Sequence, residues 1–124
     1  MPLELREIRT DELAEALRFM GEHGGVTSPK QARHDLSLVA RDEGGLTLGA
    51  AVLHRVAERA AVLQVAMDDG LADEDAARLI DKALLKAHTH RLRRIRIMVL
   101  DAERQQRLWE TQDFLKHGVQ DDAA

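Results

Sequence analysis

Apolar and polar residues alternate in several short stretches of this chain, and such alternation is typical of β-strands. Residues 3–8 show the pattern first, and residues 94–100 show it most clearly. Residues 36–41 and 46–55 are two further stretches, and the turn sequence DEGG between them predicts a hairpin. Residues 60–67 are apolar on both faces apart from Gln64, which favours a strand at the centre of a sheet.

Apolar residues spaced three or four apart predict helices between these strands. The sequence SPKQ has a capping serine, a proline at the first helical position and a glutamine three residues after the cap, which predicts a short helix. The predicted helices are residues 10–20, 28–35, 73–90 and 101–112, the first capped by Thr10 or Asp11 and the last by Asp101.

The predicted order of elements is β-α-α-β-β-β-α-β-α, which indicates an α/β (α+β) fold with a mixed sheet. Three consecutive strands form an antiparallel meander, and a right-handed βαβ crossover adds the last strand. A length of 124 residues suits a single domain over residues 1–124, with an ordered core of about residues 3–116.

Composition limits the environment and the partners. The absence of cysteine excludes disulfides, thiolate metal sites and cysteine nucleophiles. No apolar stretch approaches the length of a membrane span, so we expect no membrane contact and a cytoplasmic location. A net charge of −4 argues against nucleic acid as the main partner, because nucleic-acid-binding surfaces are usually basic.

The sequence MDDGLADEDAARLI, residues 67–80, links a predicted strand to the longest predicted helix. Many α/β proteins hold a phosphate at such a junction, because the amides at a helix start are free to bind anions. This junction has one glycine and five carboxylates, and acidic residues also favour the positive end of any helix. A phosphate site and a simple helix start are therefore alternative interpretations.

The order of elements across residues 3–114 resembles that of the GNAT family, the GCN5-related N-acetyltransferases. The sequence DAERQQRLWETQDF, residues 101–114, is similar to a second family motif, with Trp109 where a tyrosine falls and Asp113-Phe114 in place of Gly-Phe. The resemblance implies an acyl-CoA N-acyltransferase fold, acetyl-coenzyme A as cofactor and a small-molecule or protein amine as acceptor. The residues that it places at the cofactor are Val65, Met67, Leu71, Ala72, Glu74 and Ala76.

The chain departs from the family pattern in three ways. In the family, an Arg/Gln-x-x-Gly-x-Gly/Ala loop leads into the crossover helix and grips the cofactor's pyrophosphate with its backbone amides. Here Leu71 stands at the arginine position of that loop, and Ala72, Glu74 and Ala76 stand at or next to its glycine positions, where side chains obstruct a phosphate. The sequence has no tyrosine to protonate a leaving thiolate, and Gln64 is the only polar residue where a base is often found. Only ten residues follow Phe114, so we expect the C-terminal strands to be shortened or missing and a second copy to cover strand 94–100.

The resemblance and the three departures lead to two alternative predictions of function. One is a degenerate, non-catalytic relative that acts as a dimerising or binding module, with no catalytic residue and no metal site; the other is an N-acetyltransferase. An acetyltransferase should have a channel between strands 60–67 and 94–100, whereas acidic side chains or Trp109 should fill that gap in a binding module.

The basic segment HTHRLRRIR, residues 88–96, suits either phosphate contact or a solvated helix end that favours cations.

Overall fold

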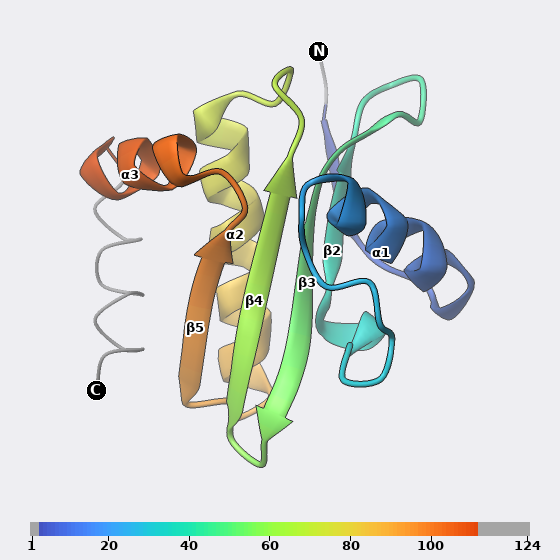
Figure 1. Cartoon of the computed structure of the whole chain (residues 1–124), viewed down its shortest axis with the longest axis vertical. Coiled ribbons are helices and arrows are strands. Elements are labelled where there is room, and N and C mark those ends of the chain that lie inside the picture. Colours follow the sequence, from blue (N-terminus) through green and yellow to red (C-terminus); the bar gives the residue numbers. More distant parts are fainter. Residues whose placement is uncertain (1–2, 112–124) are drawn as a thin grey trace.

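A five-stranded mixed sheet lies at the centre of the computed structural model, which describes residues 3–111 (Figure 1). The spatial order of the strands follows the chain, and only β4 and β5 are parallel neighbours. This arrangement confirms the predicted antiparallel meander and crossover. The strands are β1 (Glu4–Glu7), β2 (Leu38–Arg41), β3 (Thr47–Ala57), β4 (Ala60–Met67) and β5 (Arg94–Val99).

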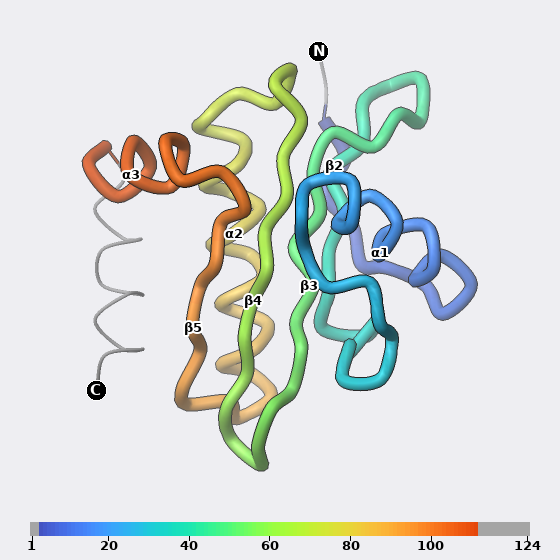
Figure 2. Tube along the Cα trace, in the orientation of Figure 1, coloured from blue at the N-terminus to red at the C-terminus, as the bar shows by residue number. Residues whose placement is uncertain are grey.

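Helices cover both faces of the sheet. A 3₁₀ turn, Thr10–Glu12, leads into α1 (Leu13–Glu22), which lies in front of the sheet in Figure 1, whereas α2 (Asp73–Thr89) lies behind it. The last helix, α3 (Ala102–Thr111), crosses near the end of β5 (Figures 1 and 2). The predicted shortening of the C-terminal strands concerns residues 112–124, which lie outside the described residues.

Each face of the sheet has its own apolar core, because successive side chains of a strand point to opposite faces. Leu63 and Val65 of β4 pack toward α2, whereas Ala66 packs toward α1. The helix α2 buries the stripe that its apolar spacing predicts: Ala76, Ile80, Ala83, Leu84 and Ala87. The alanines in this stripe allow the helix to lie close to the sheet.

The predicted helix over residues 28–35 is wrong. In its place the chain makes a turn, with Ala32 N donating to Pro29 O at 3.2 Å, and a single bridge to β3, where Arg33 N donates to Leu53 O at 2.8 Å and Arg55 N donates to Gln31 O at 2.8 Å. Only the 3₁₀ turn His34–Leu36 is helical there. Because β2 pairs only with residues 47–51 of β3, the remaining backbone of β3 needs partners, and this tertiary demand overrides the local capping signal.

Candidate functional site

Two backbone amides of the loop between β4 and α2 donate hydrogen bonds within the loop itself. Gly70 N donates to Asp68 Oδ2 at 3.2 Å, and Leu71 N donates to Asp68 O at 3.0 Å. The helix α2 follows an extended Ala72 that makes no side-chain cap, and its first internal hydrogen bond runs from Ala76 N to Ala72 O. The amides of the first turn therefore remain as donors at the positive end of a 17-residue helix.

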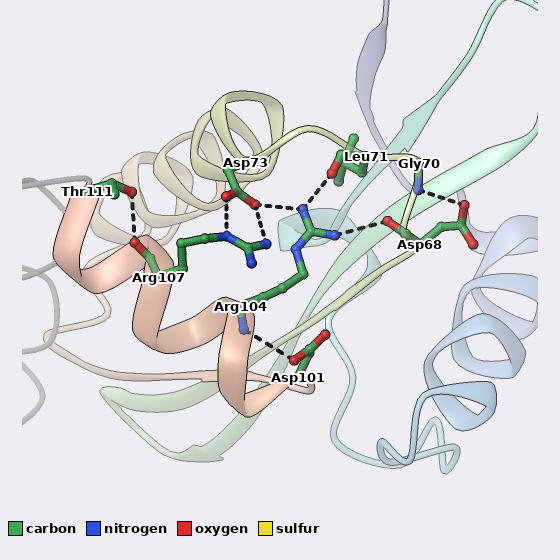
Figure 3. A network of polar contacts seen from close by, with 8 residues as sticks. All are labelled: Asp68, Gly70, Leu71, Asp73, Asp101, Arg104, Arg107 and Thr111. Atoms are coloured by element: carbon green, nitrogen blue, oxygen red, sulfur yellow. Dashed lines mark hydrogen bonds and ion pairs between the residues drawn. The ribbon is translucent and has the colours of Figure 1, made fainter.

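A carboxylate of this first turn is held by two arginines from α3 (Figure 3). Arg104 Nη2 lies 3.0 Å from Asp73 Oδ1, Arg107 Nε lies 2.5 Å from Oδ2 and Arg107 Nη2 lies 3.1 Å from Oδ1. The hydrogen bond from Arg107 lowers the pKa of Asp73 more than any other contact, and the bond from Arg104 lowers it further. Asp73 is therefore ionised, and the two arginines share its single negative charge.

Arg104 also fastens the loop to α3. Its guanidinium donates to Asp68 O at 3.0 Å and to Leu71 O at 2.5 Å, and the residue is only 6% exposed. Asp101 caps α3 as predicted, because its Oδ1 accepts from the amides of Glu103 at 3.1 Å and Arg104 at 3.2 Å. We name the set Asp73, Arg104 and Arg107 the Asp73 cluster.

The sequence contained a signal for the Asp73 cluster that sequence analysis did not use. Arg104 and Arg107 are three residues apart in a predicted helix, so they share a face of it. Their spacing alone does not name a partner, because Asp73 lies 31 residues before Arg104.

A depression of about 410 Å³ lies at the Asp73 cluster. Besides the cluster, the carboxylates of Asp69, Asp101 and Glu103 line it. These acids leave an excess of negative charge at the start of α2, where the resemblance placed a diphosphate.

Four of the six predicted cofactor residues have buried side chains. Val65, Met67, Leu71 and Ala76 all belong to the core between the sheet and α2, whereas Ala72 and Glu74 are exposed. Only the backbone of the four buried residues could meet a ligand. The assignment of all six to a cofactor stays a prediction.

The strands β4 and β5 lie side by side over the stretch in which an acetyltransferase should have a channel. They are paired from Ala60 and Arg94 up to Val65 and Val99, and Leu100 N donates to Val65 O at 2.9 Å. The expected channel is therefore closed along this pairing. Trp109 lies elsewhere, half-buried against the core on the α2 side.

Beyond the paired region, the ends of the two strands border a second depression of about 490 Å³. Its lining is acidic, with Asp68, Asp69 and Asp101 beside His23, Met67 and Leu100. His23 Nδ1 donates to Phe19 O at 2.9 Å, which holds the ring in place at the end of α1. Carboxylates in such a depression suit a cationic amine.

Gln64, the polar residue of the central strand, has a structural contact. Its Oε1 accepts from Val26 N at 2.9 Å and so holds the chain after α1 against the sheet. An amide does not act as a general base near neutral pH. Among the described residues, no group of three histidine or acidic side chains could hold a metal ion.

No protein-family model matches this sequence, and no curated protein matches it. Solved structures do match the fold. A GNAT-family acetyltransferase from Staphylococcus aureus Mu50 superposes with a TM-score of 0.58 at 13% identity, over 77% of this chain and 73% of that one. The chain has the GNAT fold.

Two further structures with the GNAT fold contain coenzyme A. Rv2747 from Mycobacterium tuberculosis, in complex with CoA and NLQ, matches with a TM-score of 0.61 at 20% identity, over 84% of this chain and 69% of that one. Spermidine N-acetyltransferase from Vibrio cholerae, in complex with CoA and spermine, matches with a TM-score of 0.58 at 17% identity, over 87% and 78%. At these identities the likeness establishes the GNAT fold alone.

No described helix is long and apolar enough to cross a membrane.

Proposed function

We propose that this protein is a non-catalytic relative of the GNAT acetyltransferases that acts as a dimerising or binding module. The observation that carries the proposal is the Asp73 cluster, because its carboxylate pairs with the two arginines that α3 directs at the start of α2. A diphosphate would have to displace Asp73 to reach them. Its cytoplasmic location stays a prediction.

Electrostatics at the start of α2 also support the proposal. Each unpaired carboxylate about 8 Å from a phosphate charge costs roughly 0.5 kcal/mol even at the dielectric constant of water. Asp69, Asp101 and Glu103 line the same depression as the Asp73 cluster, so their repulsions add. The side chains of Ala72 and Glu74 further restrict approach to the helix amides.

The chemistry available to an acetyltransferase is limited as well. The sequence contains no tyrosine that could protonate a leaving thiolate, and Gln64 is occupied by the Val26 amide. The pairing of Val65 O with Leu100 N closes β4 to a ligand that would lie along it. These features favour binding over catalysis.

The edge of β5 supports a homodimer. Within residues 3–111, β5 pairs only with β4, and an unpaired strand edge tends to recruit a further strand. Exposed Arg94 and Arg96 lie at the start of β5, whereas Asp101 and Glu103 follow its end. Antiparallel pairing of two copies about a twofold axis would place the basic start of one β5 beside the acidic end of the other.

Sedimentation equilibrium at micromolar concentration tests the dimer. We expect twice the 13.9 kDa of one chain, and a weaker dimer for Arg94→Glu/Arg96→Glu, which removes the complementary charge. The matched control is Arg18→Glu on α1, which should leave the dimer unchanged. A monomeric mass for the unsubstituted protein would refute it, as would full dimerisation of the doubly substituted protein.

Calorimetric titration of acetyl-coenzyme A and coenzyme A at low salt tests the loss of cofactor binding. We expect no heat of binding at ligand concentrations up to about 1 mM, which corresponds to a binding free energy weaker than about −4 kcal/mol. Asp73→Ala frees the exposed Arg107 and removes one negative charge, so it should bind coenzyme A more tightly than the unsubstituted protein does. Micromolar binding by the unsubstituted protein would overturn the proposal.

The acidic depression at the ends of β4 and β5 favours a second candidate, an N-acetyltransferase that acts on a cationic amine. The Vibrio cholerae neighbour holds CoA and spermine together, and Asp68, Asp69 and Asp101 here would suit a similar polyamine. The carboxylates would hold a charged nitrogen of the polyamine while another, neutral nitrogen attacks the thioester carbonyl. The carbon–sulfur bond then breaks, and the coenzyme A thiolate that leaves takes up the proton that the amine loses, so positioning supplies the rate. Incubation with acetyl-coenzyme A and spermine, followed by mass spectrometry, would detect the acetylated amine; absence of turnover favours the binding module.

A further inference from the structure

Arginines and histidines gather at the end of the sheet opposite the Asp73 cluster. The turn between β3 and β4 and the turn between α2 and β5 lie together at the lower end of Figure 2. Their contact is direct, because the amides of Arg93 and Arg94 both donate to Arg59 O, at 2.9 and 3.1 Å. The 17 residues of α2 separate this end from the Asp73 cluster by about 25 Å.

These two turns border a cavity of about 390 Å³, within the range of small-ligand sites. Its lining contains no carboxylate: Arg59, His88, Arg91, Leu92 and Arg93. Leu92 is 4% exposed and forms an apolar floor, while the cationic residues are exposed around it. The cavity therefore combines a buried apolar floor with several exposed guanidinium groups.

The charged groups around this cavity include three arginines that have no carboxylate partner among the described residues. Within the described residues, Arg59, Arg91 and Arg93 form no ion pair, although Glu58 immediately precedes Arg59 in the turn between β3 and β4. Six other arginines each have a carboxylate partner: Arg6, Arg33, Arg41, Arg78, Arg104 and Arg107. The remaining five are also without an ion pair within residues 3–111, but they do not line this cavity: Arg9, Arg18, Arg55, Arg94 and Arg96. Positive charge at this end is therefore available to an external anion, in a protein whose net charge is negative.

The backbone at Arg91 is the second observation. Arg91 N donates to His88 O at 3.0 Å and Leu92 N donates to Ala87 O at 3.1 Å, which together form a Schellman motif at the end of α2. The first residue after the cap in this motif is usually glycine, but here it is Arg91 with a φ of 64°. The left-handed conformation disfavours a side chain, so the arginine is present at a cost to stability.

A helix C-terminus favours nearby cations, and that effect accounts for His88 and His90. It does not account for Arg59, which comes from a different turn. Nor does it account for a strained arginine where glycine is the preferred residue. The Schellman motif has also already satisfied the carbonyls of Ala87 and His88.

We propose that the cavity bordered by Arg59, Arg91 and Arg93 binds a small anion with a diphosphate-like group. Guanidinium groups form paired hydrogen bonds to phosphate oxygens, and three of them around an apolar floor suit a ligand with more than one negative charge. No tyrosine is present and no aromatic residue lines the cavity, so stacking on nucleic-acid bases is not provided for. This site is independent of the Asp73 cluster.

Titration of inorganic pyrophosphate at low salt, followed by calorimetry and by backbone amide NMR shifts, tests the site. We expect saturable binding with the largest shifts at residues 58–60 and 88–94. Loss of one charge-assisted contact should weaken binding about tenfold, so Arg59→Gln/Arg91→Gln should abolish it at millimolar ligand. Arg18→Gln makes the same kind of change on α1 and should bind as the unsubstituted protein does.

Arg91→Gly separates binding from folding. Glycine relieves the left-handed strain, so the Tm should stay level or rise by a few degrees while pyrophosphate affinity falls about tenfold. Unchanged affinity in this variant would overturn the proposal.

Two other results would also overturn it. The first is loss of pyrophosphate binding in Arg107→Gln with retention in Arg59→Gln/Arg91→Gln, which would place the anion at the start of α2 and count against the proposed function as well. The second is tight binding of a single-stranded oligonucleotide without any binding of pyrophosphate, which would indicate a nucleic-acid surface.

Discussion

Replacing Asp73 by alanine should destabilise the protein, because two guanidinium groups lose their shared carboxylate. Arg107 is exposed and can turn into solvent. Arg104 cannot, since its side chain is only 7% exposed and its guanidinium is held by the carbonyls of Asp68 and Leu71. The loss of stability therefore comes mainly from Arg104, a buried cation that keeps its two carbonyl acceptors but loses the negative charge of Asp73.

The size of the effect follows from this geometry. Removing one partner of a fully buried ion pair costs about 3–5 kcal/mol. Asp73 is partly solvated, with 29% of its side chain exposed, and Arg104 retains its two carbonyl partners. We therefore expect a loss of about 2 kcal/mol, which for a domain of this size lowers the Tm by roughly 6–10 °C.

Thermal unfolding followed by circular dichroism measures this loss, and its pH dependence identifies its origin. The pKa of Asp73 is lowered in the folded state from an ordinary value of 3.8, so its contribution is complete above that value. The difference in Tm between the unsubstituted protein and Asp73→Ala should disappear as pH falls through the lowered folded pKa. A difference that persists unchanged at the lowest pH would contradict the assignment to the ionised carboxylate.

The neighbouring acid provides a matched control. Glu74→Ala removes an exposed carboxylate from the same helix turn and with it a similar interaction with the helix dipole, about 0.3–1 kcal/mol. Only the bonds to Arg104 and Arg107 distinguish the two variants. Equal losses of Tm in Asp73→Ala and Glu74→Ala would refute the reasoning.

Three further substitutions test the packing around the sheet. Burial lowers the pKa of His54, whose Nε2 has no partner among the described residues, so stability should fall as pH decreases below 6.5, and His54→Leu should flatten the Tm profile between pH 7 and 5. Gly25→Ala would place a Cβ 2.5–3.0 Å from three side chains and should cost about 1–3 kcal/mol in urea unfolding, whereas Gly44→Ala, 3.5 Å from its nearest atom, should be neutral. Ser37→Ala leaves the Leu53 amide without its acceptor and should cost about 1–3 kcal/mol in the same assay, an expectation that a change below 0.5 kcal/mol would contradict.

Periodicity was sufficient to predict most of the fold, because each helix buries one apolar stripe and the central strand β4 is apolar on both of its buried faces. The bounds of β4 agree with the predicted residues 60–67, and α2 begins at Asp73 as predicted. Residues 28–35 are the exception. Their capping pattern is local, but the unpaired backbone of β3 is a tertiary feature, and several backbone hydrogen bonds to a strand outweigh one favourable helix start.

The candidate site was harder to predict, because its contacts too are formed between residues that are far apart in the sequence. The acidic loop was visible in the sequence, and its carboxylates were interpreted as repelling a phosphate or as helix-capping charges. The structure adds that Asp73 is not a free charge, since Arg104 and Arg107 neutralise it from a helix 31 and 34 residues later in the chain. The number of acidic residues in a loop therefore overestimates its negative electrostatic potential when arginines from a distant part of the sequence pair with one of them. The repulsion of a diphosphate must therefore come from the remaining carboxylates, which include Glu74 of the first turn and the acids that line the depression, and competition with Asp73 for the two arginines adds a second obstacle at the start of α2.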